Sequence, residues 1–302
     1  MNGILIVDKP KGLTSSKVIG ILKHACGREK TGHTGTLDPN ATGVLPVCFG
    51  NATNVCGALT DSSKEYIAEL ILGKETDTYD ITGTVVAENK SRVTYEELLS
   101  ALEGFKGRIM QVPPMFSAKW QNGERLYDLA RKGVVVEREA KEIEISKLEV
   151  LNYIEEAGFI SKAYITVGCS KGTYIRSLCH DIGEKLSCGA CMGDLRRIKV
   201  GMFTIEKSVT LDEAVKLANE GKIAEKLISA DSVYDYPCVK AESAEVNPLL
   251  VNGNRIHKKG IDAGMLPGLY KMYDENGVFR AIYELRDHAK YLYPYIVFPE
   301  NP

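Results

Sequence analysis

Segments with strand periodicity and segments with helix periodicity follow one another irregularly along the chain, and this order limits the folds that it can adopt. Residues 66–72 alternate between two faces, as a strand does, and residues 4–7 form a short apolar run. Apolar residues recur at helical spacing in 18–26 and in 175–186. Because no regular βαβ repetition links these segments, the sequence predicts an α+β fold.

The length and the change of pattern near the end predict two domains. A chain of 302 residues is long enough for about two domains. The boundary is predicted near Asp235-Tyr236-Pro237, because the runs 269–273 and 278–285 beyond it flank Asn276-Gly277, a strong hairpin signal. Periodicity is weak from 106 to 142. We therefore expect a larger domain over 1–235 with an insertion at about 106–142, and a β-rich domain over 236–302.

Charge, hydropathy and cysteine content restrict the partners and the compartment. The net charge of −2 gives no support for nucleic-acid binding, so any RNA-binding charge must be local. No signal peptide and no apolar run near the roughly 20 residues of a membrane span is visible, which predicts a cytoplasmic protein without a membrane partner. Cys188-Gly-Ala-Cys191, with His180 upstream, permits a zinc site. It lacks a second cysteine pair, so we expect structural thiols and no metal.

The segment 32–43, GHTGTLDPNATG, is the most unusual part of the sequence. Its three glycines allow the backbone to approach a ligand closely, and Pro39 biases Asp38 towards an extended conformation. The apolar residues on either side would hold this carboxylate on a stiff corner. The residues alone leave two interpretations open, namely a catalytic carboxylate or an Asp-Pro pair that only starts a turn.

Together with Asp8-Lys9-Pro10-Lys11-Gly12, this segment closely resembles the TruB family of tRNA pseudouridine synthases. The resemblance covers nearly the whole chain and includes further motifs in the same order. These are Lys64-Glu65-Tyr66, the run 73–83 (GKETDTYDITG), the run 113–118 (PPMFSA), the run 169–178 (CSKGTYIRSL), Leu195-Arg196-Arg197 and Val251-Asn252-Gly253-Asn254.

The resemblance assigns roles to individual residues of this chain. It implies that Asp38 is the catalytic aspartate and that the other members of the site bind the substrate or the aspartate. These are Tyr66 stacking on the base, Arg176 pairing with Asp38, Asp80 sharing that arginine, Leu195 beneath the base, His33 near the flipped nucleotides, and Lys64. From the residues alone, Tyr66 and Leu195 are equally compatible with a core, His33 with a loop, and Asp80 with the surface.

The chemistry of these residue types suits pseudouridine formation. Asp38 can attack C1′ as a nucleophile or stabilise the positive charge that develops there, and the order of bond making stays open. A cation at the start of a helix is disfavoured by the macrodipole, so Arg176 is expected to have a specific carboxylate partner. An aromatic ring such as that of Tyr66 can hold the uracil by stacking. The reaction neither oxidises nor reduces the substrate, so we expect no cofactor.

Basic residues gather in four places, which predicts a local RNA-binding surface despite the net negative charge. Residues 1–33 contain six Lys or Arg and two acidic residues. The other three groups are Lys106, Arg108, Lys119, Arg125, Arg131, Lys132, Arg138 and Lys141 in the expected insertion, then Arg196, Arg197 and Lys199, and finally Arg255, His257, Lys258 and Lys259.

The family resemblance implies the fold and the substrate. The expected fold is a mixed, largely antiparallel sheet with flanking helices, a thumb-like insertion, and a small C-terminal β domain resembling a PUA domain. The implied substrate is the uridine at position 55 in the T loop of tRNA, modified by base flipping, with no obligate protein partner and a monomeric enzyme. Two alternatives remain open, an RNA-folding chaperone with secondary catalysis and a guide-dependent rRNA pseudouridine synthase.

Overall fold

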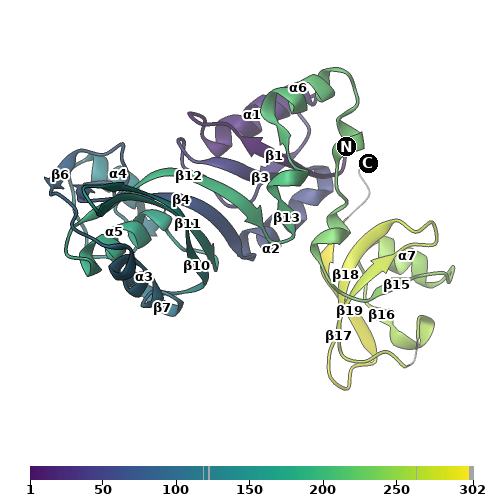
Figure 1. Ribbon diagram of the computed structural model, residues 1–302. Helices are drawn as coiled ribbons and strands as arrows, with labels where there is room; N and C mark the ends of the chain where they lie inside the picture. Colours follow the sequence, from purple (N-terminus) through teal and green to yellow (C-terminus); the bar gives the residue numbers. More distant parts are fainter. Residues whose placement is uncertain (118, 122, 263, 299–302) are drawn as a thin grey trace.

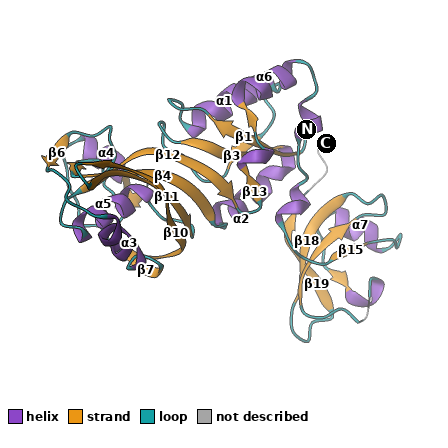
Figure 2. Cartoon of the chain, viewed as in Figure 1, coloured by secondary structure: helices purple, strands orange, loops and turns teal. Residues whose placement is uncertain are grey.

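The computed structural model describes residues 1–298 apart from 118, 122 and 263. Most of the described chain is built around a 10-stranded mixed sheet (Figure 2). Its strands are β1 (Gly3–Lys9), β2 (Thr31–His33), β3 (Thr42–Phe49), β4 (Lys64–Leu72), β7 (Gly107–Gln111), β10 (Lys141–Glu156), β11 (Phe159–Cys169), β12 (Ala190–Val200), β13 (Phe203–Thr204) and β14 (Val209–Thr210). Their order is β14-β1-β3-β12-β4-β11-β10-β7, with β13 beside β12 and β2 beside β3.

The pairing in this sheet is largely antiparallel, as the family resemblance implied. Only the β1–β14 and β3–β12 pairs are parallel among its pairs of described strands. The helices are α1 (Ser15–Ala25), α2 (Cys56–Asp61), α3 (Tyr95–Glu103), α4 (Leu126–Arg131), α5 (Ile175–Lys185), α6 (Leu211–Asn219) and α7 (Val246–Val251). The short 3-10 helices are η1 (Gly50–Val55), η2 (Ile205–Lys207), η3 (Ile223–Lys226), η4 (Ala230–Val233) and η5 (Lys258–Gly260). No helix in the described ranges is long and apolar enough to cross a membrane.

Strand β1 shows how the sheet is buried on both faces. Leu5 and Val7 belong to the core beneath α1 and α6, whereas Ile4 and Ile6 belong to a second core on the opposite face. Side chains alternate between the two faces of a strand, so a continuous apolar run can supply both cores. A third core lies under α3 and α5 against β4, β10 and β11.

The ends of the helices follow from local sequence. The hydroxyl of Thr14 accepts a hydrogen bond from the amide of Lys17 and caps α1. Thr94 caps α3, and the side chain of Glu97 accepts a hydrogen bond from the amide of Thr94, which completes a capping box. These caps fix where the helices begin.

A second sheet of five strands lies beyond residue 237 and is drawn in yellow and yellow-green in Figure 1. Its strands are β15 (Cys238–Lys240), β16 (Ile256–His257), β17 (Gly268–Tyr273), β18 (Phe279–Leu285) and β19 (Tyr291–Val297), in the order β15-β17-β18-β19-β16. Ile282 and Phe298 from this part pack in the same core as Ile4 of β1. The C-terminal β domain therefore shares a core with the larger domain, and the side-chain amide of Asn54 in η1 donates to the carbonyl of Val297 at 2.8 Å.

Two expectations differ from the structure in detail. Part of the predicted insertion is regular, because β7 pairs with β10 at the edge of the large sheet. The rest of that region holds a hairpin of β8 (Trp120–Gln121) and β9 (Glu124–Arg125), followed by α4. The basic run at 196–199 belongs to β12, an interior strand between β3 and β4. Its pairing with β4 shifts register between Met192 and Leu195, which disrupts the alternation that would reveal a strand.

Candidate active site

The segment that carries Asp38 connects β2 to β3 and is fixed to the start of α1. The amide of Leu37 donates to the hydroxyl of Ser15 at 2.9 Å, and the same hydroxyl donates to the carbonyl of Leu37 at 3.2 Å. The amide of Gly12 donates to the carbonyl of Pro39 at 2.8 Å. These bonds hold the backbone on both sides of Asp38, so the Asp-Pro corner is anchored rather than a free turn.

A buried lysine lies beneath this corner. The ammonium of Lys9 donates to the carbonyls of Pro10 at 2.9 Å, Leu13 at 2.6 Å and Pro39 at 3.0 Å. Burial lowers the pKa of Lys9 to about 8, while Asp38 acts to raise it. Lys9 belongs to the motif at 8–12, but no role for it was predicted from the sequence. A lysine between a buried strand and a proline is the signal that could have identified it.

Arg176 brings together two aspartates from distant parts of the chain. Its Nε lies 3.1 Å from Oδ2 of Asp38, and its Nη1 lies 3.6 Å from Oδ2 of Asp80. The guanidinium also donates to the carbonyl of Phe116 at 2.8 Å and more weakly to that of Thr78 at 3.4 Å. The planar group thus serves several acceptors in fixed directions, which an ammonium could not do.

Asp80 is fixed by its own loop between β5 (Lys74–Thr76) and β6 (Val85–Glu88). Its Oδ1 accepts hydrogen bonds from the amide of Thr82 at 3.0 Å and from the hydroxyls of Thr82 and Thr78. Its Oδ2 remains for Arg176. Asp80 therefore acts as a positioned acceptor that helps to orient the guanidinium.

Asp38 differs from its partners in exposure. The Arg176 side chain is 9% exposed, whereas that of Asp38 is 44% exposed. In the part of the chain that the structure describes, no donor is found for Oδ1 of Asp38. The arrangement holds one carboxylate oxygen on a buried guanidinium and leaves the other accessible for a reaction.

Tyr66 and Leu195 lie on neighbouring strands β4 and β12 and share a core with Leu37. Burial raises the pKa of Tyr66, and the positive charge of Arg197 acts in the opposite direction. Tyr66 as a whole is 9% exposed. Leu37, Tyr66 and Leu195 thus form an apolar floor next to the Asp38 corner.

Arg197 was expected to contribute to a phosphate-binding cluster, and that expectation is wrong. Its side chain is buried, and it donates to the carbonyls of Val44 at 2.8 Å and Gly35 at 3.0 Å. Gly43, at φ 103°, passes so close that a Cβ there would lie 2.1 Å from the carbonyl oxygen of Arg197. Arg197 therefore holds the two ends of the Asp38 segment together.

The neighbours of Arg197 in this cluster are also occupied by partners within the chain. Arg196 pairs with Asp8 at 2.7 Å, and Lys199 pairs with Glu65 at 3.0 Å.

His33 and Lys64 lie near this segment but outside the ion-pair network. His33 ends β2, its buried Nδ1 has no hydrogen-bond partner among the described residues, and burial lowers its pKa. The ammonium of Lys64 donates to the carbonyls of Thr60 and Ser62, both at 2.5 Å, at the end of α2. Burial lowers the pKa of Lys64 to about 8. Its contacts are those of a residue that supports the backbone.

Exposed cations remain in the other basic groups. On α4, Arg131 lies 4.4 Å from the ring centre of Tyr127, and in the C-terminal sheet Arg255 lies 4.7 Å from that of Tyr291. The side chain of Arg125 falls outside the described part of the structure. Cations that lie over aromatic rings at a surface are suited to contact with a nucleic-acid strand.

The sequence and fold also match known proteins. Residues 23–175 match the TruB family pseudouridylate synthase (N terminal domain), and 176–232 match the tRNA pseudouridylate synthase B C-terminal domain. The tRNA pseudouridine synthase B of Clostridium tetani is 43% identical over 91% of this chain and 93% of its own. That of Syntrophomonas wolfei is 39% identical over the full length of both.

Among solved structures, the chain is similar to one described as a Cbf5-Nop10-Gar1 complex, with a TM-score of 0.72 and 27% identity over 99% of this chain and 87% of that one. A second, described as an H/ACA RNP bound to a substrate RNA containing 2′-deoxyuridine, gives a TM-score of 0.72 and 26% identity over 99% and 85%. The family matches together cover more than half of the chain. The chain belongs to the TruB family of pseudouridylate synthases.

Proposed function

We propose that the protein is a tRNA pseudouridine synthase that isomerises the uridine at position 55 in the T loop of tRNA, with Asp38 as the catalytic residue. The observation that carries this proposal is the state of Asp38. One of its oxygens is held at 3.1 Å by a buried arginine, and its side chain is otherwise half exposed. The relatives that are about 40% identical over most of the chain, and that are named for this activity, support the choice of tRNA as substrate.

The reaction breaks the bond from C1′ to N1, turns the uracil over and joins C5 to C1′. The proton on C5 is lost, and N1 gains one, so atoms balance without an oxidant or a cofactor. The accessible oxygen of Asp38 attacks C1′ as a nucleophile or stabilises the positive charge that develops on this carbon. Arg176 orients the carboxylate of Asp38, and Asp80 keeps the arginine in place.

The target base must leave its stack before it can react. Flipping a nucleotide out of a folded loop costs about a few kcal/mol, which contacts to the RNA have to offset. We propose that Tyr66 receives the uracil against the apolar floor that it forms with Leu37 and Leu195. Its ring is largely covered in the free protein, so the base is expected to displace neighbouring side chains from one face.

Binding of the rest of the RNA is assigned to the exposed basic groups. We propose residues 236–302 as a PUA-like RNA-binding domain, in which Arg255 and Tyr291 contact the RNA, and residues 106–142 as the insertion that holds the loop. We further propose a monomeric, cytoplasmic enzyme. His33 is assigned a place near the flipped nucleotides, because its unpartnered Nδ1 lies at the end of β2, where the Asp38 segment begins.

The test is to incubate the protein with an unmodified tRNA transcript and to map pseudouridine along it. The matched control is the same transcript with a cytidine in place of the uridine at position 55. We expect modification at that position in the first RNA and none in the second. Absence of pseudouridine, or its appearance at other uridines in both transcripts, would overturn the proposed specificity. A protein that speeds tRNA folding but forms no pseudouridine would instead be a chaperone.

A further inference from the structure

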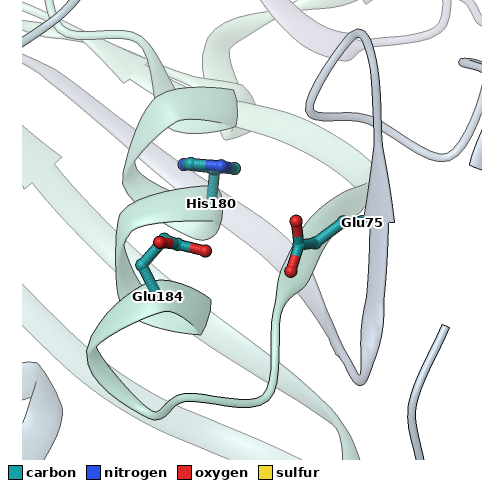
Figure 3. Close-up of side chains that lie close together, drawn as sticks. All are labelled: Glu75, His180 and Glu184. Carbon is teal, nitrogen blue, oxygen red and sulfur yellow. The ribbon is translucent and has the colours of Figure 1, made fainter. Parts of the chain in front are cut away.

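A second cluster of chemically active side chains lies one helical turn beyond Arg176. Glu75 comes from β5, and His180 and Glu184 come from α5 (Figure 3). Residues four apart on a helix share a face, so His180 and Glu184 both point towards the strand that carries Glu75. A potential ligand atom from each of the three lies within 4.8 Å of those of the other two.

The imidazole of His180 is held in one orientation. Its Nδ1 lies 3.2 Å from Oδ1 of Asp181, and its ring stacks on that of Tyr79 at 4.0 Å between centres. A carboxylate that accepts a hydrogen bond from one ring nitrogen fixes the proton there and leaves the lone pair on the other. This is the arrangement that metal-binding histidines commonly have.

The carboxylate of Glu75 occupies space that a side chain at position 189 would otherwise fill. Gly189 has a φ of 73°, and a Cβ there would lie 2.3 Å from a carboxylate oxygen of Glu75. Within the described ranges, neither Glu75 nor Glu184 forms an ion pair with a lysine or an arginine. Among the described residues, two carboxylates and an imidazole therefore meet without an ion pair from either carboxylate to a lysine or an arginine.

We propose that Glu75, His180 and Glu184 bind a divalent transition-metal ion of the zinc class. One nitrogen and two carboxylate oxygens form a ligand set that zinc accepts, and a water molecule can complete the coordination. The cysteines that the sequence suggested for a metal do not take part. Cys191 is buried in the core, and the thiol of Cys188 donates to the carbonyl of Gly189 at 3.3 Å.

The position of this site gives it a structural role. The ion would connect α5, which carries Arg176, to β5, which begins the loop that carries Asp80. Tyr79, which stacks on His180, is the residue before Asp80. A metal here would not touch the reacting atoms. It would hold the two elements that orient the arginine of the Asp38 network.

The test is calorimetric titration of chelator-treated full-length protein with Zn²⁺, together with the absorption spectrum of the Co²⁺ form. His180→Phe keeps an aromatic ring on Tyr79 but removes the nitrogen ligand, and Glu184→Gln changes an exposed ligand at little risk to folding. The matched controls are His24→Phe and Glu96→Gln, exposed residues of α1 and α3. Cys188→Ser tests whether a thiol binds the ion.

We expect a single saturable Zn²⁺ site in the wild-type protein, in the two matched controls and in Cys188→Ser. Loss of a ligand should weaken binding at least about tenfold, since even residues behind the ligands have effects of that size. Zn²⁺ should raise the unfolding temperature of the wild-type protein but not of His180→Phe or Glu184→Gln. Wild-type affinity in both ligand variants, loss of binding in Cys188→Ser, or no saturable binding at all would overturn the proposal.

Discussion

Two aspartate–arginine pairs, one in each sheet, differ in how completely the carboxylate is enclosed. In the C-terminal β domain, Oδ2 of Asp274 lies 2.6 Å from Nη2 of Arg280, and the Asp274 side chain is 2% exposed. Its Oδ1 accepts hydrogen bonds from the amides of Asn276 at 2.9 Å and Val278 at 2.8 Å. In the large sheet, Asp38 contacts its arginine through one oxygen and remains half exposed.

The difference distinguishes a structural pair from the pair that we propose to be reactive. Burial acts to raise the pKa of Asp274, but the hydrogen bonds from Val278 and Arg280 outweigh it and hold the pKa below its usual value. Both oxygens of Asp274 have partners, so this carboxylate closes the β17–β18 turn and has no site left for a substrate. A carboxylate that reacts must keep an oxygen unoccupied, which is the state of Asp38.

The largest expected effect is on turnover in Asp38→Asn. The amide has almost the same shape but cannot act as a carboxylate, so the single-turnover rate on tRNA should fall at least about a thousandfold, or about 4 kcal/mol in barrier. RNA affinity and the unfolding temperature should stay near wild type. Asp274→Asn is the matched control and should retain the rate. A rate within about tenfold of wild type in Asp38→Asn would remove the distinction between the two pairs.

Arg176→Lys should impair turnover although it conserves charge. Lysine lacks the fork that contacts Asp38, Asp80 and the carbonyl of Phe116 together, so the carboxylate loses its orientation. We expect a rate about a hundredfold lower, roughly 3 kcal/mol, which is within the range for breaking a buried pair. Single-turnover rates and RNA affinity are measured separately. Arg280→Lys should leave the rate unchanged, and equal loss of rate in both variants would contradict a specific role for Arg176.

Much of the framework follows from local sequence, because the signals are local. The alternation in 66–72 became β4, the helical spacing in 175–186 became α5, and Asn276-Gly277 turns the β17–β18 hairpin. Strand β12 was not predicted. It contains Gly193 and a register shift, and it buries Arg197, so its pattern resembles a basic surface loop more than an interior strand.

The composition of the site could not be derived from local pattern. Asp38, Asp80 and Arg176 come from three loops or helix starts that only the complete sheet brings together. Their association was proposed from a family resemblance, and no periodicity indicated it. The buried ammonium of Lys9 and the position of Glu75 against Gly189 are also products of tertiary packing. Sequence alone treats such lysines and glutamates as surface residues.

The Asp274–Arg280 pair should contribute measurably to the free energy of unfolding. Asp274→Asn loses charge-assisted bonds to Arg280 and should lower the free energy of unfolding by about 2 kcal/mol at pH 7. Because the folded-state pKa of Asp274 lies below the ordinary 3.8, its contribution is present above that value and lost as pH falls through the folded-state pKa. Urea unfolding at several pH values should therefore show the two proteins converging in acid. A constant difference down to the lowest pH would show that the charge of Asp274 contributes nothing.

The region around Asp38 should show a pH dependence of the same sign but in the alkaline range, through Lys9. Its pKa is about 8 in the folded protein and 10.5 in an ordinary environment, so between these values the unfolded chain binds more protons than the folded one. Stability then increases as pH rises from about 8 to 10.5, by at most about 1.4 kcal/mol per pH unit, and the effect is absent below pH 8.

Lys9→Met isolates this contribution, because other groups that titrate in alkali are common to both proteins. Methionine fills a similar volume without the ammonium, so the variant should lack the part of the alkaline slope that comes from Lys9. It also loses the hydrogen bonds to Leu13 and Pro39, and its turnover should fall modestly as the Asp38 corner loosens. Urea unfolding from pH 7 to 10.5 measures the difference in slope. If the two slopes coincide, Lys9 is charged throughout, and the three carbonyl acceptors outweigh the effect of burial.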